Sequence, residues 1–121
     1  MKQGFVKVAS ATPRIRVADP VYNAQVICEQ AKEAAEHGAK IVVFPELCIT
    51  GYTCNDLFLQ ELLLEKAKEA LLTIVEETGQ LEALFLVGLP VDKDGRLYNV
   101  AAVLYRGRIL GMIPKKNIPM Y

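Results

Sequence analysis

Two charged side chains suited to acyl-transfer chemistry each follow an apolar run that ends in proline. Glu46 comes after the run 40–44, and Lys115 comes after the run 109–113. A carboxylate held among apolar residues has a raised pKa and acts as a general base, and a nearby ammonium stabilises the oxyanion that develops in acyl transfer. Because catalytic groups gather at the carboxyl ends of strands in α/β sheets, the repeated pattern predicts that Glu46 and Lys115 lie close together.

Each of these positions also has an ordinary explanation when it is taken singly. Glu46 is consistent with a solvated loop acid, and Lys115 with its neighbour Lys116 is consistent with a surface pair of cations. Under this alternative the chain is a non-catalytic α/β module used for assembly or binding, and Glu46 and Lys115 form a structural ion pair.

The chain offers three cysteines as candidate nucleophiles. Cys28 falls on the apolar stripe of a predicted helix, so we expect it to be a packing residue. Cys48 and Cys54 follow Glu46 closely in the sequence and are expected near the site. The odd number of cysteines and their spacing exclude a closed disulfide framework and a C-x-x-C zinc or redox pair, which favours a reduced, cytoplasmic protein.

The first half of the chain reads as strand, helix, strand. Residues 4–11 and 40–44 have strand composition. We expect much of the surface of the first strand to be covered and the second strand to be covered on both faces. Between them, Asp19 as N-cap and Pro20 at the first helical position predict a helix that Gly38 ends.

The second half predicts a helix and three further strands. The helix runs from about residue 55 to Gly79, and a buried strand follows over residues 84–91. After a turn at 92–95, residues 98–105 and 109–113 predict a hairpin. The order β-α-β-α-β-β-β predicts an α/β fold with a mixed sheet and two helices on one face.

Composition narrows the possible partners. The 14 basic and 14 acidic residues give zero formal charge, which weighs against a nucleic-acid partner. No apolar run reaches the ~18–20 residues of a membrane span, so we expect no membrane partner.

The hydrophobic share of 52% is high for a free domain whose 121 residues suffice for one core. This surplus predicts apolar surface that lacks its covering layer.

A set of motifs in order along the chain resembles the nitrilase (carbon–nitrogen hydrolase) superfamily. The motifs are Val43-Phe44-Pro45-Glu46-Leu47, Gly51-Tyr52, Tyr98-Asn99, Gly107, Leu110-Gly111 and Pro114-Lys115. Asp56-Leu57-Phe58 and the ending Lys115-x-x-Ile118-Pro119-x-Tyr121 resemble, within that superfamily, the glutaminase domain of glutamine-dependent NAD synthetases. The resemblance covers essentially the whole chain.

The resemblance implies a fold, a reaction and roles for three residues. The fold is an α-β-β-α sandwich, of which residues 1–121 are the N-terminal part; the rest of the glutaminase domain and the synthetase domain are absent. A Glu–Lys–Cys triad hydrolyses the glutamine amide. Glu46 takes the role of the base, Lys115 supports the oxyanion and Tyr121 lines the glutamine pocket.

The resemblance leaves the nucleophile outside this chain, because the family's cysteine lies downstream of the lysine and neither Cys48 nor Cys54 matches its context. We therefore expect the isolated chain to be inactive. No cofactor is expected within it; ATP and magnesium are implied for the absent synthetase domain, and homo-oligomers are typical of the family. A stand-alone amidase acting on another small amide is the alternative, against which the ending Ile118-Pro119-x-Tyr121 argues.

Overall fold

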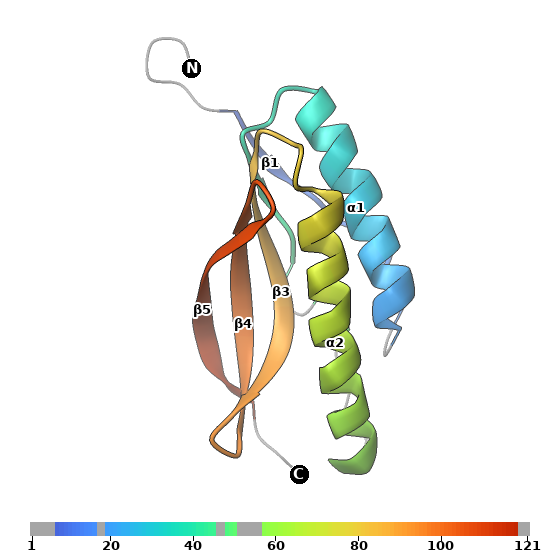
Figure 1. Ribbon diagram of the computed structural model, residues 1–121, viewed down its shortest axis with the longest axis vertical. Coiled ribbons are helices and arrows are strands. Elements are labelled where there is room, and N and C mark those ends of the chain that lie inside the picture. Colours follow the sequence, from blue (N-terminus) through green and yellow to red (C-terminus); the bar gives the residue numbers. More distant parts are fainter. Residues whose placement is uncertain (1–6, 17–18, 46–47, 51–56, 119–121) are drawn as a thin grey trace.

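Two helices lie side by side on one face of a five-stranded sheet (Figure 1). The computed structural model describes residues 7–16, 19–45, 48–50 and 57–118. Its elements are β1 (Val8–Ser10), α1 (Pro20–Glu36), β2 (Ile41–Val43), α2 (Leu57–Glu77), β3 (Leu84–Lys93), β4 (Arg96–Tyr105) and β5 (Arg108–Ile118). This order confirms the predicted α/β arrangement and its two helices.

The sheet has the order β1-β2-β3-β4-β5 and is mixed, as predicted. The pairs β1–β2 and β2–β3 are parallel, whereas β3–β4 and β4–β5 are antiparallel. Parallel neighbours need a crossover connection, and α1 and α2 supply the two crossovers. Both crossovers run over the same face, so within the described residues the opposite face carries no helix.

Two tight turns build the antiparallel half of the sheet. Asp94 and Gly95 join β3 to β4 with φ values of 53° and 74°, and Arg106 and Gly107 join β4 to β5 with φ values of 50° and 79°. Two successive positive φ values are typical of the type I′ turn, whose twist matches that of the flanking strands. The expected four-residue turn at 92–95 was therefore too long, because β3 continues to Lys93.

Helix α1 begins and ends where the sequence predicts. The Asp19 carboxylate accepts a hydrogen bond from the Tyr22 backbone N–H at 3.2 Å, and Pro20 occupies the first helical position. Gly38 adopts a φ of +88° just beyond the helix, a conformation in which glycine avoids the cost of a Cβ atom.

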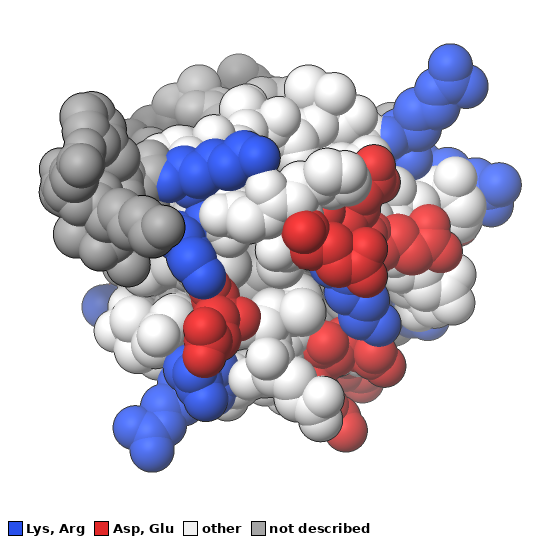
Figure 2. All heavy atoms as spheres, turned by 90° about the horizontal axis from the view of Figure 1, so that it is seen from above, with Lys and Arg blue, Asp and Glu red and all other residues white. Residues whose placement is uncertain are grey.

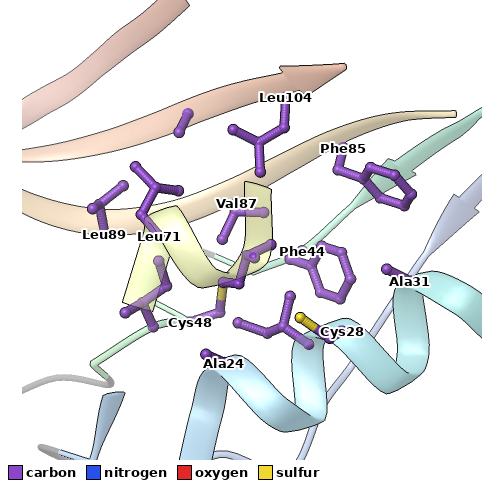
Figure 3. Packing of buried hydrophobic residues seen from close by; sticks show 14 of the residues in the cluster. Ala24, Cys28, Ala31, Phe44, Cys48, Leu71, Phe85, Val87, Leu89 and Leu104 are labelled. Atoms are coloured by element: carbon purple, nitrogen blue, oxygen red, sulfur yellow. The ribbon is translucent and has the colours of Figure 1, made fainter. Parts of the chain in front are cut away.

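The hydrophobic core lies between the helices and one face of the sheet (Figure 3). Each helix contributes both alanines and larger apolar residues, and the strands contribute alternate residues. Core residues that are at most 2% exposed are Ala24, Ile27, Ala31, Ala39, Val42, Cys48, Ile49, Ala67, Leu71, Ile74, Ala83, Phe85, Val87, Leu89, Ala102 and Leu104.

The opposite face of the sheet is apolar, and it is exposed along β1, the end of β2 and β5. Val8 is 58% exposed, Val43 is 37% exposed and Ile113 is 49% exposed. The expectation that the strand at 4–11 is covered over much of its surface and the strand at 40–44 on both faces was therefore wrong within the described residues, because both helices pack on the other face. The expected uncovered apolar surface is present on this sheet face.

Truncation of a core side chain in α2 tests this packing. Ile74 is completely buried, so Ile74→Ala should lower the free energy of unfolding by about 2–5 kcal/mol through lost transfer energy and a residual cavity. Leu72 on the same helix is 60% exposed, and Leu72→Ala should change it by less than about 0.5 kcal/mol. Urea denaturation measures both variants, and equal losses would contradict the burial assigned to α2.

Candidate functional site

The candidate residues fall on both described and undescribed parts of the chain. Lys115 lies in β5, whereas Glu46, Tyr121 and Cys54 lie outside the described residues. The geometry of the site is therefore built from the described residues that flank these positions.

The segment that contains Glu46 is attached to β3 at both of its ends. On the N-terminal side, the Phe44 N–H donates to the Leu86 carbonyl oxygen at 2.9 Å. On the C-terminal side, the Ile49 N–H donates to the Gly88 carbonyl oxygen at 3.1 Å. Because Leu86 and Gly88 are two residues apart on one strand, Phe44 and Ile49 are held close to each other along β3.

A buried asparagine in α1 holds the same loop from the helix side. Asn23 is fully buried, and its Nδ2 donates to the carbonyl oxygens of Ile49 and Arg16, at 2.7 Å each. Its Oδ1 accepts from the Arg16 N–H at 2.6 Å. Sequence reasoning missed Asn23, although a polar residue on the inner side of an amphipathic helix is a usable signal.

Cys48 points into the core rather than toward a solvent-facing site (Figure 3). Its thiol donates to the Gly88 carbonyl oxygen at 3.6 Å and its Sγ accepts from the Gly88 N–H at 3.4 Å. Burial raises the pKa of the Cys48 thiol to about 12. Because the thiolate is the reactive form, Cys48 is unsuited to nucleophilic attack at neutral pH.

Cys28 is a packing residue, as expected. It is 6% exposed and lies in the core cluster on α1. Burial, with a contribution from the nearby Glu77 carboxylate, raises the pKa of the Cys28 thiol to about 11. Cys28 and Cys48 are therefore both protonated thiols at neutral pH.

A small cavity lies where the end of β2 meets β3 and β4. Its volume is about 160 Å³. It is lined by Val43, Phe44, Pro45, Leu86, Gly88, Asn99, Val100 and Ala101. Strand ends in α/β sheets are the usual place for ligands and catalytic groups. The residue that directly follows the lining residue Pro45 is Glu46.

Asn99 contributes the one polar side chain among the residues that line this cavity. It is 1% exposed, and neither its Nδ2 nor its Oδ1 has a hydrogen-bond partner among the described residues. A buried polar group without a partner is rare in folded proteins. The sequence analysis used Asn99 only as part of a motif, although an asparagine within the apolar strand β4 is itself a signal.

Lys115 occupies an irregularity of β5 opposite Asn99. The register pairs Asn99 with Lys116 and Val100 with Pro114, so Lys115 is the extra residue of a β-bulge. The expectation that Lys115 follows the end of a strand was wrong, because β5 continues to Ile118. Proline is tolerated there because β5 is an edge strand of this sheet, where a missing N–H breaks no central ladder.

The cavity is lined by residues that neighbour the two predicted catalytic positions in the chain or in the strand register. Pro45, which precedes Glu46, and Asn99, whose register partner follows Lys115, line the same space. Bulges commonly re-aim side chains next to active sites. A carboxylate and an ammonium beside this cavity would be suited to transfer a proton and to stabilise an oxyanion during amide hydrolysis.

A larger hollow of about 430 Å³ lies between α2 and the end of β3 and is a weaker candidate. It is lined by Glu61, Leu62, Leu64, Glu65, Lys68 and Asp92. All four ionisable residues are exposed, so they lack the burial that tunes acid–base groups. Acidic and basic side chains are likewise intermixed on the face of the molecule that Figure 2 shows.

In the described ranges, no group of three or more His, Cys, Asp or Glu side chains is arranged to hold a metal ion. No helix in these ranges combines the length and apolar character needed to cross a membrane.

Comparisons with known proteins identify relatives of this chain. The glutamine-dependent NAD(+) synthetase of Mycobacterium tuberculosis is 39% identical over 120 residues, which is 99% of this chain and 18% of that protein. The crystal structure of a glutamine-dependent NAD(+) synthetase from Cytophaga hutchinsonii superposes with a TM-score of 0.83 at 29% identity, covering 94% of this chain and 19% of the other. The chain thus spans about a fifth of the length of these relatives.

An amidase from Nesterenkonia sp. has the same fold, with a TM-score of 0.75 at 23% identity, and the match covers 95% of this chain and 44% of the amidase. These superpositions confirm the expected nitrilase-like fold, of which the chain represents a part. The family model described as carbon-nitrogen hydrolase matches residues 7–119. The chain belongs to the carbon–nitrogen hydrolase family.

Proposed function

We propose that this chain supplies the general base and the oxyanion-stabilising cation of a glutaminase. The ammonia it releases would serve the ATP-dependent synthesis of NAD from deamido-NAD. The observation that supports this proposal is that one cavity is lined both by Pro45, which precedes Glu46, and by Asn99, which stands opposite the bulge at Lys115. The choice of glutamine as the substrate rests on the relatives, which are glutamine-dependent NAD(+) synthetases.

The proposed reaction divides the work between the two side chains and a cysteine thiol. Glu46 takes the thiol proton, and the sulfur attacks the carboxamide carbon of glutamine. The ammonium of Lys115 stabilises the tetrahedral oxyanion. Collapse breaks the carbon–nitrogen bond, Glu46 returns the proton to the leaving ammonia, and water then hydrolyses the thioester to glutamate.

The nucleophile in this proposal is a cysteine beyond residues 1–121, as the family resemblance implies. The burial and raised pKa values of Cys28 and Cys48 support this proposal for two of the three cysteines of the chain. Tyr121 would line the glutamine pocket. ATP and magnesium would serve a separate synthetase domain, and no step of amide hydrolysis is routed through them. We further propose a cytoplasmic homo-oligomer without nucleic-acid or membrane partners.

Removal of either charged group should abolish glutamine hydrolysis. In the protein made from the complete reading frame, Glu46→Gln and Lys115→Ala should each lower kcat by about 10³-fold or more, because each removes a group that acts in the transition state. Release of ammonia from glutamine measures the effect. Glu82→Gln removes an exposed carboxylate that pairs with Arg106 and should leave the rate unchanged.

Two results would count against this assignment. Near-normal activity of Glu46→Gln and Lys115→Ala would leave only a structural ion pair. Faster hydrolysis of other small amides than of glutamine by the unmodified protein would favour a stand-alone amidase.

The buried thiols predict both the inactivity of the isolated chain and its response to pH. Cys28 and Cys48 should resist iodoacetamide at about pH 8 until urea unfolds the chain. Their pKa values are raised in the folded state, so their contribution to stability is complete below about pH 9. It is lost as the pH rises further, because only the unfolded chain then releases these protons.

Peptide-resolved mass spectrometry after alkylation measures the first effect, and urea midpoints between about pH 8 and pH 11 measure the second. The isolated chain should release no ammonia from glutamine. Release that disappears in Cys48→Ser or Cys54→Ser would contradict the proposed external nucleophile.

A further inference from the structure

The two fully described asparagines of this fold have opposite surroundings. Asn23 makes three hydrogen bonds through its carboxamide, although it is completely buried. Asn99 is 1% exposed, and its carboxamide makes none with the described residues. An unpaired buried polar group costs about 1–3 kcal/mol. The fold therefore provides hydrogen-bond partners for the buried Asn23 but leaves the buried Asn99 without any among the described residues. Packing does not explain this loss of stability at Asn99.

Asn99 is the polar member of an otherwise apolar environment. It is among the residues that line the cavity of about 160 Å³, and the other side chains of that lining are apolar. Its Nδ2 and Oδ1 atoms are themselves buried and without a partner among the described residues. The carboxamide offers one acceptor oxygen and two donor hydrogens, so a partner on the neighbouring strand could bond to it.

The strand register brings the Lys115 position within reach of Asn99. In the bulge, Lys115 and Lys116 together stand opposite Asn99. Residues directly opposite on antiparallel strands have Cβ atoms about 4.5–5.5 Å apart, which a lysine side chain spans easily. An ammonium has three donors and no acceptor, so the carboxamide oxygen of Asn99 is a suitable partner for it.

We propose that Asn99 is a positioning residue for the reaction, with its Oδ1 accepting a hydrogen bond from the Lys115 ammonium. This inference rests on the proposed amide hydrolysis. The hydrogen bond holds the cation where the oxyanion forms and keeps it from turning toward solvent. Pre-organised cations stabilise a transition state because they need no reorientation as charge develops.

Two nearly isosteric substitutions at Asn99 distinguish positioning from packing. Asn99→Asp keeps an acceptor oxygen in place of Oδ1, whereas Asn99→Leu keeps the shape and removes both polar atoms. In the protein made from the complete reading frame, Asn99→Leu should lower kcat for glutamine by about 10²-fold, the effect of a small misplacement of a catalytic group. Asn99→Asp should lower kcat by less than about tenfold, and KM should change by less than about threefold in both.

A purely structural role predicts the reverse order. A carboxylate buried in an apolar cavity is costly, and leucine is the better packing residue there. Rates are referred to the folded fraction measured by circular dichroism, so a loss of folded protein is not read as a loss of catalysis. Val103→Ala, on the same face of β4 and outside the cavity lining, is the matched control and should keep the wild-type kcat.

The outcomes separate this inference from the proposed function. Absence of glutamine hydrolysis in the unmodified protein would remove the proposed function itself. With that activity present and lost in Glu46→Gln, a kcat of Asn99→Leu within about threefold of wild type would overturn the positioning role. An Asn99→Leu variant that matches or exceeds Asn99→Asp, or an effect on KM alone, would overturn it as well.

Discussion

The backbone of β3 is the support on which the rest of this structure depends. It forms parallel hydrogen bonds with β2 and antiparallel ones with β4, so both halves of the mixed sheet meet on it. Its carbonyl oxygens at Leu86 and Gly88 also receive the N–H groups that flank the Glu46 loop. Any displacement of β3 would therefore move the core, the sheet and the candidate catalytic edge together.

The two faces of β3 have different tasks. Phe85, Val87 and Leu89 point toward the helices and are at most 1% exposed. Leu86 and Gly88 alternate with them and line the cavity on the uncovered face. Because one strand carries both sets, the hydrophobic effect that fixes the helices also fixes the position of the cavity wall. The uncovered face can then present polar groups without disturbing the core.

Local signals predicted most of the fold. Asp19, Pro20 and Gly38 mark the ends of α1 through capping and backbone geometry, which depend on near neighbours in the chain. The exposure of Val43 was not predictable in the same way, because an unbroken apolar run does not say which layers cover its strand. That coverage is decided by where both crossover helices pack, which is a property of the whole chain.

The candidate site was predictable in its residue types but not in its construction. Glu46 and Lys115 were found through the repeated proline and charge pattern, and their roles remain predictions. The bulge at Lys115 depends on how β5 pairs with β4, and the unpartnered state of Asn99 depends on what surrounds it in space. Neither the bulge nor the missing partners of Asn99 can be predicted from a local pattern of the sequence. Two different backbone features thus flank the predicted catalytic positions. Hydrogen bonds to β3 hold Phe44 and Ile49 on either side of Glu46 in the sequence. A bulge in an edge strand displaces Lys115 from regular pairing without breaking the sheet.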